Sequence, residues 1–216
     1  MDNKALQTRV ETELQWEPSI DSSEIGVAVD SGVVTLSGAV PTYAEKTAAE
    51  RCALRIKGVR GVAQEIEVRP FGDVGVKDDE IAKRALRMLE WNTMIPPDKI
   101  QVKVEGGRVT LSGEVDWNFE RESADRIVQG LFGVRAVANQ VKVKPRVQAD
   151  NVHTRIEEAL NRQSRIEAGG IRVFVEGGKV RLEGKVHAWS DRATIEHAAW
   201  AAPGVTAVDD RVTIAA

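Results

Sequence analysis

The residues of this chain that could take part in catalysis or bind a metal are few and scattered. The 216-residue sequence contains three histidines, His153, His187 and His197, and one cysteine, Cys52. The spacing of the histidines matches no zinc site. Cys52 falls on the apolar face of an expected helix, a position typical of a small buried residue. We therefore expect no catalytic centre, no resident metal and no cofactor.

Three acidic residues beside expected turns are the candidates for cation binding: Asp30, Glu105 and Glu176. Together with neighbouring backbone carbonyls, their carboxylates offer the oxygen ligands that Ca²⁺ prefers. Turns are commonly polar and solvated for reasons unrelated to metals. The competing interpretation is therefore that the three acidic residues are ordinary turn residues that bind no cation. Both interpretations remain open from the sequence alone.

Four aromatic residues, Tyr43, Trp117, Phe119 and Trp189, lie between an expected strand and the helix that follows it. Such residues can contact a protein partner or a membrane, since the ring favours burial while its polar edge tolerates water. The competing interpretation is that they close the core of their own unit or pack on the next one.

Two further tryptophans, Trp16 and Trp91, occupy equivalent positions, 75 residues apart, at the end of an expected first helix. We expect them to close a core or the seam between units.

The elements that position these residues belong to a unit that occurs three times. Segments of the form I-x-V-x-V-x-x-G-x-V-x-L-x-G-x-V begin at Ile25, Ile100 and Ile171, so the copies are spaced by 75 and 71 residues. Alternating apolar residues on both sides of a glycine-containing turn predict a β-hairpin. In each copy an amphipathic stretch with helical spacing precedes the hairpin, and a second helical stretch and one more strand follow it.

We predict an α+β fold of three tandem αββαβ modules, over residues 1–70, 76–145 and 149–216. Each module should contain a three-stranded mixed sheet covered on one face by two helices. In the middle copy the helices are expected over about 79–92 and 119–131, with Asp78 as the N-cap of the first. Short linkers predict that neighbouring modules touch. The pattern leaves open which hairpin strand borders the third strand.

Glycines recur at two positions in every copy, and we interpret them as structural. In a strand, a glycine permits a bulge or a close approach to another element. After a helix, it permits the positive φ of a left-handed cap. The glycines concerned are Gly38, Gly113 and Gly184 in the second hairpin strand, and Gly58, Gly133 and Gly204 after the second helix.

Composition fits a folded protein and excludes some classes of partner. Hydrophobic residues make up 42% of the chain and charged residues 29%, and the net charge is −3. Because positive charge is not concentrated in any module, nucleic-acid binding is not expected. No apolar run reaches the length of a membrane span, and the N-terminal stretch shows no apolar signal region. We therefore expect a cytoplasmic location, with a periplasmic one as the alternative if a leader has been removed.

The helix, the hairpin and the later G-V-x-x-V segment, which begins at Gly58, Gly133 and Gly204, occur in the same order in all three copies. This combination resembles the BON module, named for bacterial OsmY and nodulation proteins, and the chain is similar to OsmY-type members over nearly its whole length. The resemblance implies αββαβ binding modules associated with phospholipid membranes, envelope maintenance and osmotic stress. The family also includes a potassium-binding relative.

These observations predict a noncatalytic binding or scaffold protein, linked to envelope or osmotic-stress maintenance through contacts with a phospholipid or protein surface. The alternative is a cytoplasmic sensor that binds a cation, K⁺ or Ca²⁺. The ligand and the oligomeric state do not follow from the sequence.

Overall fold

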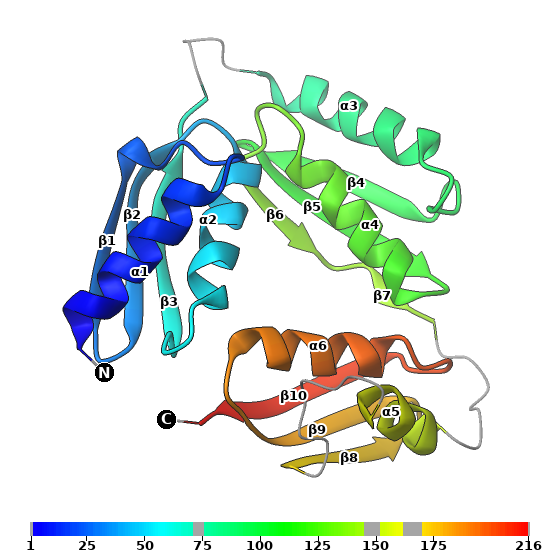
Figure 1. Cartoon of the computed structure of the whole chain (residues 1–216). Helices are drawn as coiled ribbons and strands as arrows, with labels where there is room; N and C mark the ends of the chain where they lie inside the picture. Colours follow the sequence, from blue (N-terminus) through cyan, green and yellow to red (C-terminus); the bar gives the residue numbers. More distant parts are fainter. Residues whose placement is uncertain (1, 71–75, 145–151, 162–169, 216) are drawn as a thin grey trace.

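The computed structural model describes residues 2–70, 76–144, 152–161 and 170–215, which form three modules of one α+β design (Figure 1). The first module comprises α1 (Asn3–Trp16), the 3-10 helix η1 (Ser22–Glu24), β1 (Ile25–Asp30), β2 (Val33–Val40), α2 (Tyr43–Arg55) and β3 (Gly61–Val68). The second comprises α3 (Asp78–Trp91), β4 (Ile100–Glu105), β5 (Arg108–Val115), α4 (Asn118–Gln129), β6 (Ala136–Asn139) and β7 (Lys142–Val143). The third comprises α5 (Val152–Asn161), β8 (Ile171–Glu176), β9 (Lys179–Val186), α6 (Trp189–Trp200) and β10 (Ala207–Ile214). The predicted αββαβ order is confirmed; the predicted boundaries at residues 145 and 149 lie outside the described residues.

In each sheet the second hairpin strand is the central one. β1 pairs antiparallel with β2, with Ile25 opposite Gly38 and Asp30 opposite Val33, and β3 runs parallel to β2, with Val33 opposite Gly61. The same order recurs as β4-β5-β6 and as β8-β9-β10. The second helix of each module therefore supplies the crossover that a parallel pair of strands needs.

The two helices of each module pack on one face of its sheet (Figure 1). Helix α1 buries Leu6, Val10 and Leu14, which are spaced by four residues along one face. Strand β2 meets them with Val34 and Leu36, which are fully buried. Burial of each such side chain contributes about 1.5–3 kcal/mol. Each module has a buried core of this kind, and residues of the first and third modules pack on the core of the second.

Asp78 has a different role from the N-cap that we predicted. It is the first residue of α3, and Lys77 stands at the N-cap without a side-chain hydrogen bond. The Asp78 carboxylate accepts hydrogen bonds from the backbone N–H groups of Gly106, at 2.7 Å, and of Gly107, at 2.9 Å. It therefore ties the start of the helix to the hairpin turn, because those turn amides have no partner within the ladder.

The glycines after the second helices have positive φ, at 103° for Gly58, 93° for Gly133 and 92° for Gly204. Helix α4 has already ended at Gln129, however, and Gly130 is its C-cap in a right-handed conformation. Gly133 thus lies in the turn that leads to β6, beyond the position of a helix cap.

The glycines of the second hairpin strand also have positive φ, at 120° for Gly38, 131° for Gly113 and 153° for Gly184. A Cβ at Gly38 would lie 1.9 Å from the carbonyl oxygen of Glu24, and one at Gly113 would lie 2.0 Å from that of Lys99. The close approach is therefore to the backbone just before the neighbouring strand, which in the first module is the end of the short helix η1, and not to either of the two α-helices.

A polar residue in the third strand of each module ties that strand to the second helix. The Gln64 amide donates to the carbonyl of Lys46, at 3.3 Å, and Asn139 donates in the same way to Arg121, at 2.9 Å. In the third module the contact is an ion pair between Arg192 of the helix and Asp210 of the strand, at 2.6 Å. The tie is thus repeated with different chemistry in the three copies.

The three modules lie around a common centre, with α2, α4 and α6 on the inner side (Figure 1). Tyr43 at the start of α2 packs on the core of the second module, and Trp200 at the end of α6 packs on the cores of the second and third modules. Helix α2 also contacts α6, so the third module returns to the first. Neighbouring modules therefore touch, as the short linkers predicted.

The expectation that Trp16 and Trp91 close a core or a seam is wrong. Their residues are 81% and 85% exposed. An α-helix turns by about 100° per residue, so a side chain two positions after the last buried residue, Leu14 or Leu89, points away from the core. The two indole rings instead lie at the surface, at the ends of α1 and α3.

Candidate binding cleft between the first and third modules

The three acidic turn residues do not come together. Asp30, Glu105 and Glu176 end the first hairpin strand of three different modules. Asp30 accepts a hydrogen bond from the Ser31 hydroxyl at 3.1 Å, and Glu105 pairs with Lys103 at 3.0 Å. Within the described residues no group of three or more His, Cys, Asp or Glu side chains could hold a metal ion. The predicted acids therefore form no common cation site.

Three of the four predicted contact aromatics lie where modules meet. Tyr43 packs on the second module, where it forms a hydrogen bond with the backbone of Val137, and burial raises the pKa of its phenol. Trp117 lies beside the end of α6 in the third module. Trp189 faces the first module across a cleft. Phe119, in contrast, is exposed to solvent.

Trp200 forms the contact between the second and third modules. The guanidinium of Arg121 stacks over its ring, 4.8 Å from the centroid, and its Nε1 donates to Glu196 at 3.4 Å. Arg121 comes from α4, so this cation–π contact spans two modules. Sequence reasoning missed Arg121, because nothing along the chain relates a surface arginine to a ring so far away.

A cleft of about 610 Å³ lies between α2 of the first module and α6 of the third. This volume is in the range of small-molecule sites. Its apolar surface comes from Ala48, Leu54, Ala193 and the ring of Trp189. Its charged rim comes from Glu17, Arg51 and Arg55 on the first module and Arg192, Glu196 and Asp210 on the third.

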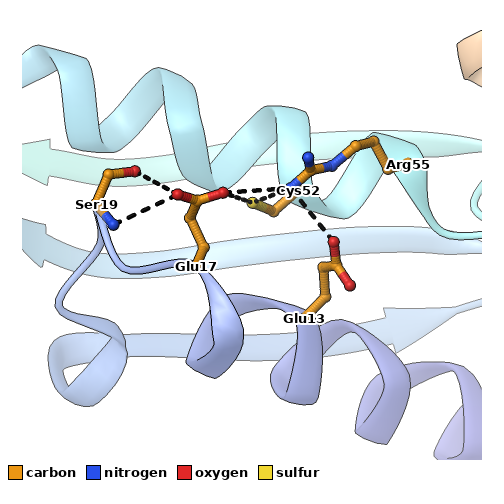
Figure 2. Close-up of polar contacts among 5 residues, drawn as sticks. All are labelled: Glu13, Glu17, Ser19, Cys52 and Arg55. Atoms are coloured by element: carbon orange, nitrogen blue, oxygen red, sulfur yellow. Dashed lines mark hydrogen bonds and ion pairs between the residues drawn. The ribbon is translucent and has the colours of Figure 1, made fainter.

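Figure 2 shows the polar cluster on the first-module side of this cleft. Arg55 pairs with Glu13 at 3.3 Å and with Glu17 at 3.4 Å, and its Nη2 lies 3.1 Å from the sulfur of Cys52. The backbone N–H and hydroxyl of Ser19 donate to Glu17, and these hydrogen bonds lower the pKa of that carboxyl. The cluster therefore holds the end of α1 against α2.

Cys52 is a buried thiol within this cluster. Burial raises the pKa of Cys52, and the hydrogen bond from Arg55 only partly opposes that effect. A thiol with a raised pKa stays protonated at neutral pH and is a poor nucleophile. Its place in the core of the first module agrees with the interpretation of Cys52 as a small packing residue.

On the third-module side, Arg192 connects helix α6 to strand β10. It pairs with Asp210 at 2.6 Å, and its guanidinium stacks on the ring of Trp189, 4.8 Å from the centroid. The indole Nε1 of Trp189 is buried and has no hydrogen-bond partner among the described residues. This wall thus contains a ring that Arg192 holds in place and whose buried indole N–H is unused.

A second hollow of about 440 Å³ lies next to the cleft, between α2 and α4, and Arg51 lines both. Asp125 lies in this hollow, where burial raises the pKa of its carboxyl, against the opposing effect of hydrogen bonds from Asn139 and Gln129. Arg121 and Arg126 complete its charged surface.

None of the described helices is both long and apolar enough to pass through a bilayer. Large apolar side chains are exposed at the surface of the described residues, among them Trp16, Met88, Trp91 and Met94.

Two curated proteins resemble the chain over most of their length. It is 31% identical over 148 residues to Osmotically-inducible protein Y of Escherichia coli (strain K12), covering 67% of this chain and 74% of that protein. It is 26% identical over 150 residues to Outer membrane lipoprotein DolP of Haemophilus influenzae, covering 62% of this chain and 74% of that protein. A solved structure of CdsD, a structural protein of the type III secretion system of Chlamydia trachomatis, matches with 16% identity and a TM-score of 0.27 over 98% of this chain and 92% of that one, too low for any argument.

The cytoplasmic location expected from the sequence is contradicted by these relatives, one of which is a lipoprotein of the outer membrane. The expectation rested on the lack of an apolar signal region in the first residues. Such a lack is no guide to where a chain of this family works.

The model of the BON domain matches residues 2–70, 77–145 and 148–216, which is almost the whole chain. Each match contains one αββαβ module of the structure. The chain therefore belongs to the BON domain family and carries three BON domains in tandem.

Proposed function

We propose that this chain is a noncatalytic binding protein of the bacterial envelope, and that it docks on a phospholipid surface through the exposed ends of α1 and α3. The observation that carries the proposal is the exposure of Trp16 and Trp91, at 81% and 85%. Tryptophan suits a membrane interface, because its ring is apolar while its N–H can stay hydrated. Leaving two such rings in water has no benefit for the fold.

The end of α3 offers the stronger of the two contacts. Met88 lies one helical turn before Trp91 on the same face and is exposed, and Met94 is exposed in the segment that follows the helix. Arg87, four residues before Trp91, is also exposed and provides a cation for anionic headgroups. The tip thus combines apolar side chains that can enter a bilayer with a charge that can remain at its surface.

The relatives support the envelope part of the proposal. One is an outer membrane lipoprotein and another is osmotically inducible, so a role in maintaining the envelope under osmotic stress is consistent with both. Neither name refers to an enzymatic activity, and the buried Cys52 is held in its unreactive form.

The test is flotation of the full chain with vesicles of phosphatidylcholine, alone or mixed with phosphatidylglycerol. We expect the wild-type chain to float with the mixed vesicles, and Trp91→Ala to lower its affinity roughly tenfold, because one interfacial ring is lost. Since Trp91 is exposed, the melting temperature of the variant should be unchanged.

Phe119→Ala is the matched control, because Phe119 is an exposed aromatic on a different element. It should float like the wild-type chain. A double variant with Trp16→Ala and Trp91→Ala that floats undiminished would refute the proposal, and a loss confined to Phe119→Ala would move the contact to the start of α4.

A further inference from the structure

The cleft between the first and third modules has two donor groups that the protein itself leaves unused. Trp189 Nε1 is buried and has no partner among the described residues. Arg51 lines the cleft and makes no hydrogen bond or ion pair within the described part of the chain. Burying an N–H group without an acceptor is unfavourable, so the wall favours an occupant that supplies one.

The other two cations of the cleft are already paired. Arg55 is held by Glu13 and Glu17, and Arg192 is held by Asp210. Glu196, at the edge of the cleft, accepts a hydrogen bond from Trp200 Nε1 at 3.4 Å. Arg51 is therefore the cation of the described lining that still lacks an anionic partner. An anionic group fits this demand, because charge-assisted hydrogen bonds from a guanidinium are about twice as strong as neutral ones.

The rest of the lining requires an apolar body. Ala48, Leu54, Ala193 and Trp189 give the lining apolar side chains, and the cleft of about 610 Å³ can hold one chain of about ten carbons with its head. A two-chain phospholipid is too large to be enclosed there.

We propose that this cleft binds a single-chain anionic amphiphile, with its head at Arg51 and Trp189 Nε1 and its alkyl chain along α2 and α6. The head is a carboxylate, as in a fatty acid, or a phosphate, as in a lysophospholipid. This site uses neither Trp16 nor Trp91, so the proposal does not depend on docking to a membrane. Because the walls belong to different modules, the occupant joins the first module to the third.

The test uses the full chain and a bromine-labelled decanoate below its micellar concentration, since bromine on the chain quenches indole fluorescence only at close range. We expect saturable quenching that is largely lost in Trp189→Phe, because this substitution removes the indole that lines the cleft while it keeps an aromatic ring for Arg192. Ala193→Leu should also abolish it by filling the cleft, and because Ala193 is exposed on α6 the fold should be unaffected.

Arg51→Gln should raise the dissociation constant roughly tenfold, because the only unpaired cation of the described lining is removed. Arg126→Gln is the matched control: Arg126 occupies the equivalent position of α4 but does not line this cleft, so its affinity should equal that of the wild-type chain. Bromine-labelled decanol should bind about tenfold more weakly than decanoate. If decyl phosphate displaces the labelled decanoate at a lower concentration than unlabelled decanoate does, the preferred head is a phosphate. If it needs a higher concentration, the preferred head is a carboxylate.

Absence of saturable quenching would overturn the proposal, as would quenching that persists in both Trp189→Phe and Ala193→Leu. Equal losses of affinity in Arg51→Gln and Arg126→Gln would also overturn it. They would show that binding depends on the overall charge of the protein and not on this cleft. Flotation of the Ala193→Leu chain with vesicles tests docking on a membrane, whereas quenching by bromine-labelled decanoate tests the cleft. The failure of one proposal can therefore be told from the failure of the other.

Discussion

At the scale of single residues, the structure separates positions that look alike in the sequence. Gly38 and Gly61 lie in neighbouring strands of one sheet, but Gly38 has a φ of 120° and faces a backbone carbonyl, whereas a Cβ at Gly61 would meet nothing within 4 Å. The recurrence of Gly38 in the repeat therefore follows from a steric requirement. No ligand is needed to explain it.

Gly38→Ala should reduce the free energy of unfolding by about 2–4 kcal/mol, because the new Cβ would lie 1.9 Å from the Glu24 oxygen in a backbone conformation that alanine disfavours. Gly61→Ala should change it by less than about 0.5 kcal/mol. Urea denaturation followed by circular dichroism measures both. Equal effects of the two substitutions would show that the strand glycine is not a structural requirement.

At the scale of elements, side chains that look like helix caps can serve another element. Asp78 begins α3 but binds the turn between β4 and β5, so helix and hairpin are held together at one end of the module. Glu120 is used in the expected way: in α4 it accepts hydrogen bonds from the backbone N–H groups of Asp116 and Trp117, at 2.8 and 2.9 Å. The local pattern predicts that such a carboxylate accepts hydrogen bonds from backbone amides, but it does not predict which amides donate them.

Asp78→Ala should cost about 1–2 kcal/mol of stability, because it leaves two amides of the hairpin turn without their acceptor. The neighbouring Asp79→Ala removes an exposed ion pair with Lys83 and should cost much less, because solvent screens that pair. Thermal and urea unfolding of the two variants can be compared directly. If Asp79→Ala were the more damaging change, Asp78 would be acting as a helix residue and not as a tie.

At the scale of the whole molecule, the modules form a closed arrangement in which each module contacts the other two. The first touches the second through Tyr43, the second touches the third through Arg121 and Trp200, and the third returns to the first across the cleft beside Trp189. Aromatic side chains at the two ends of the second helices thus make the contacts between modules. Trp16 and Trp91, at the ends of α1 and α3, stay exposed, and their exposed fractions exceed those of the exposed residues Phe119, Phe132 and Phe174.

Trp200→Ala should loosen this arrangement, because the ring packs on two modules and under Arg121. We expect a loss of about 2–3 kcal/mol and a larger radius of gyration in X-ray scattering, with a flattened intermodule peak in the distance distribution. Trp91→Ala is the control and should change neither quantity, since that ring is in solvent. An unchanged radius of gyration for Trp200→Ala would mean that the modules are held together by other contacts.

Several features followed from the sequence alone: the three copies, the αββαβ order, the α+β class and the helix faces of Leu6, Val10 and Leu14. These depend on local periodicity, and each hairpin turn is encoded within a few residues. The strand order, the exposure of Trp16 and Trp91 and the cleft beside Trp189 depended on the tertiary structure. They result from packing between segments tens of residues apart, and periodicity along one segment carries no information about the surface against which it packs.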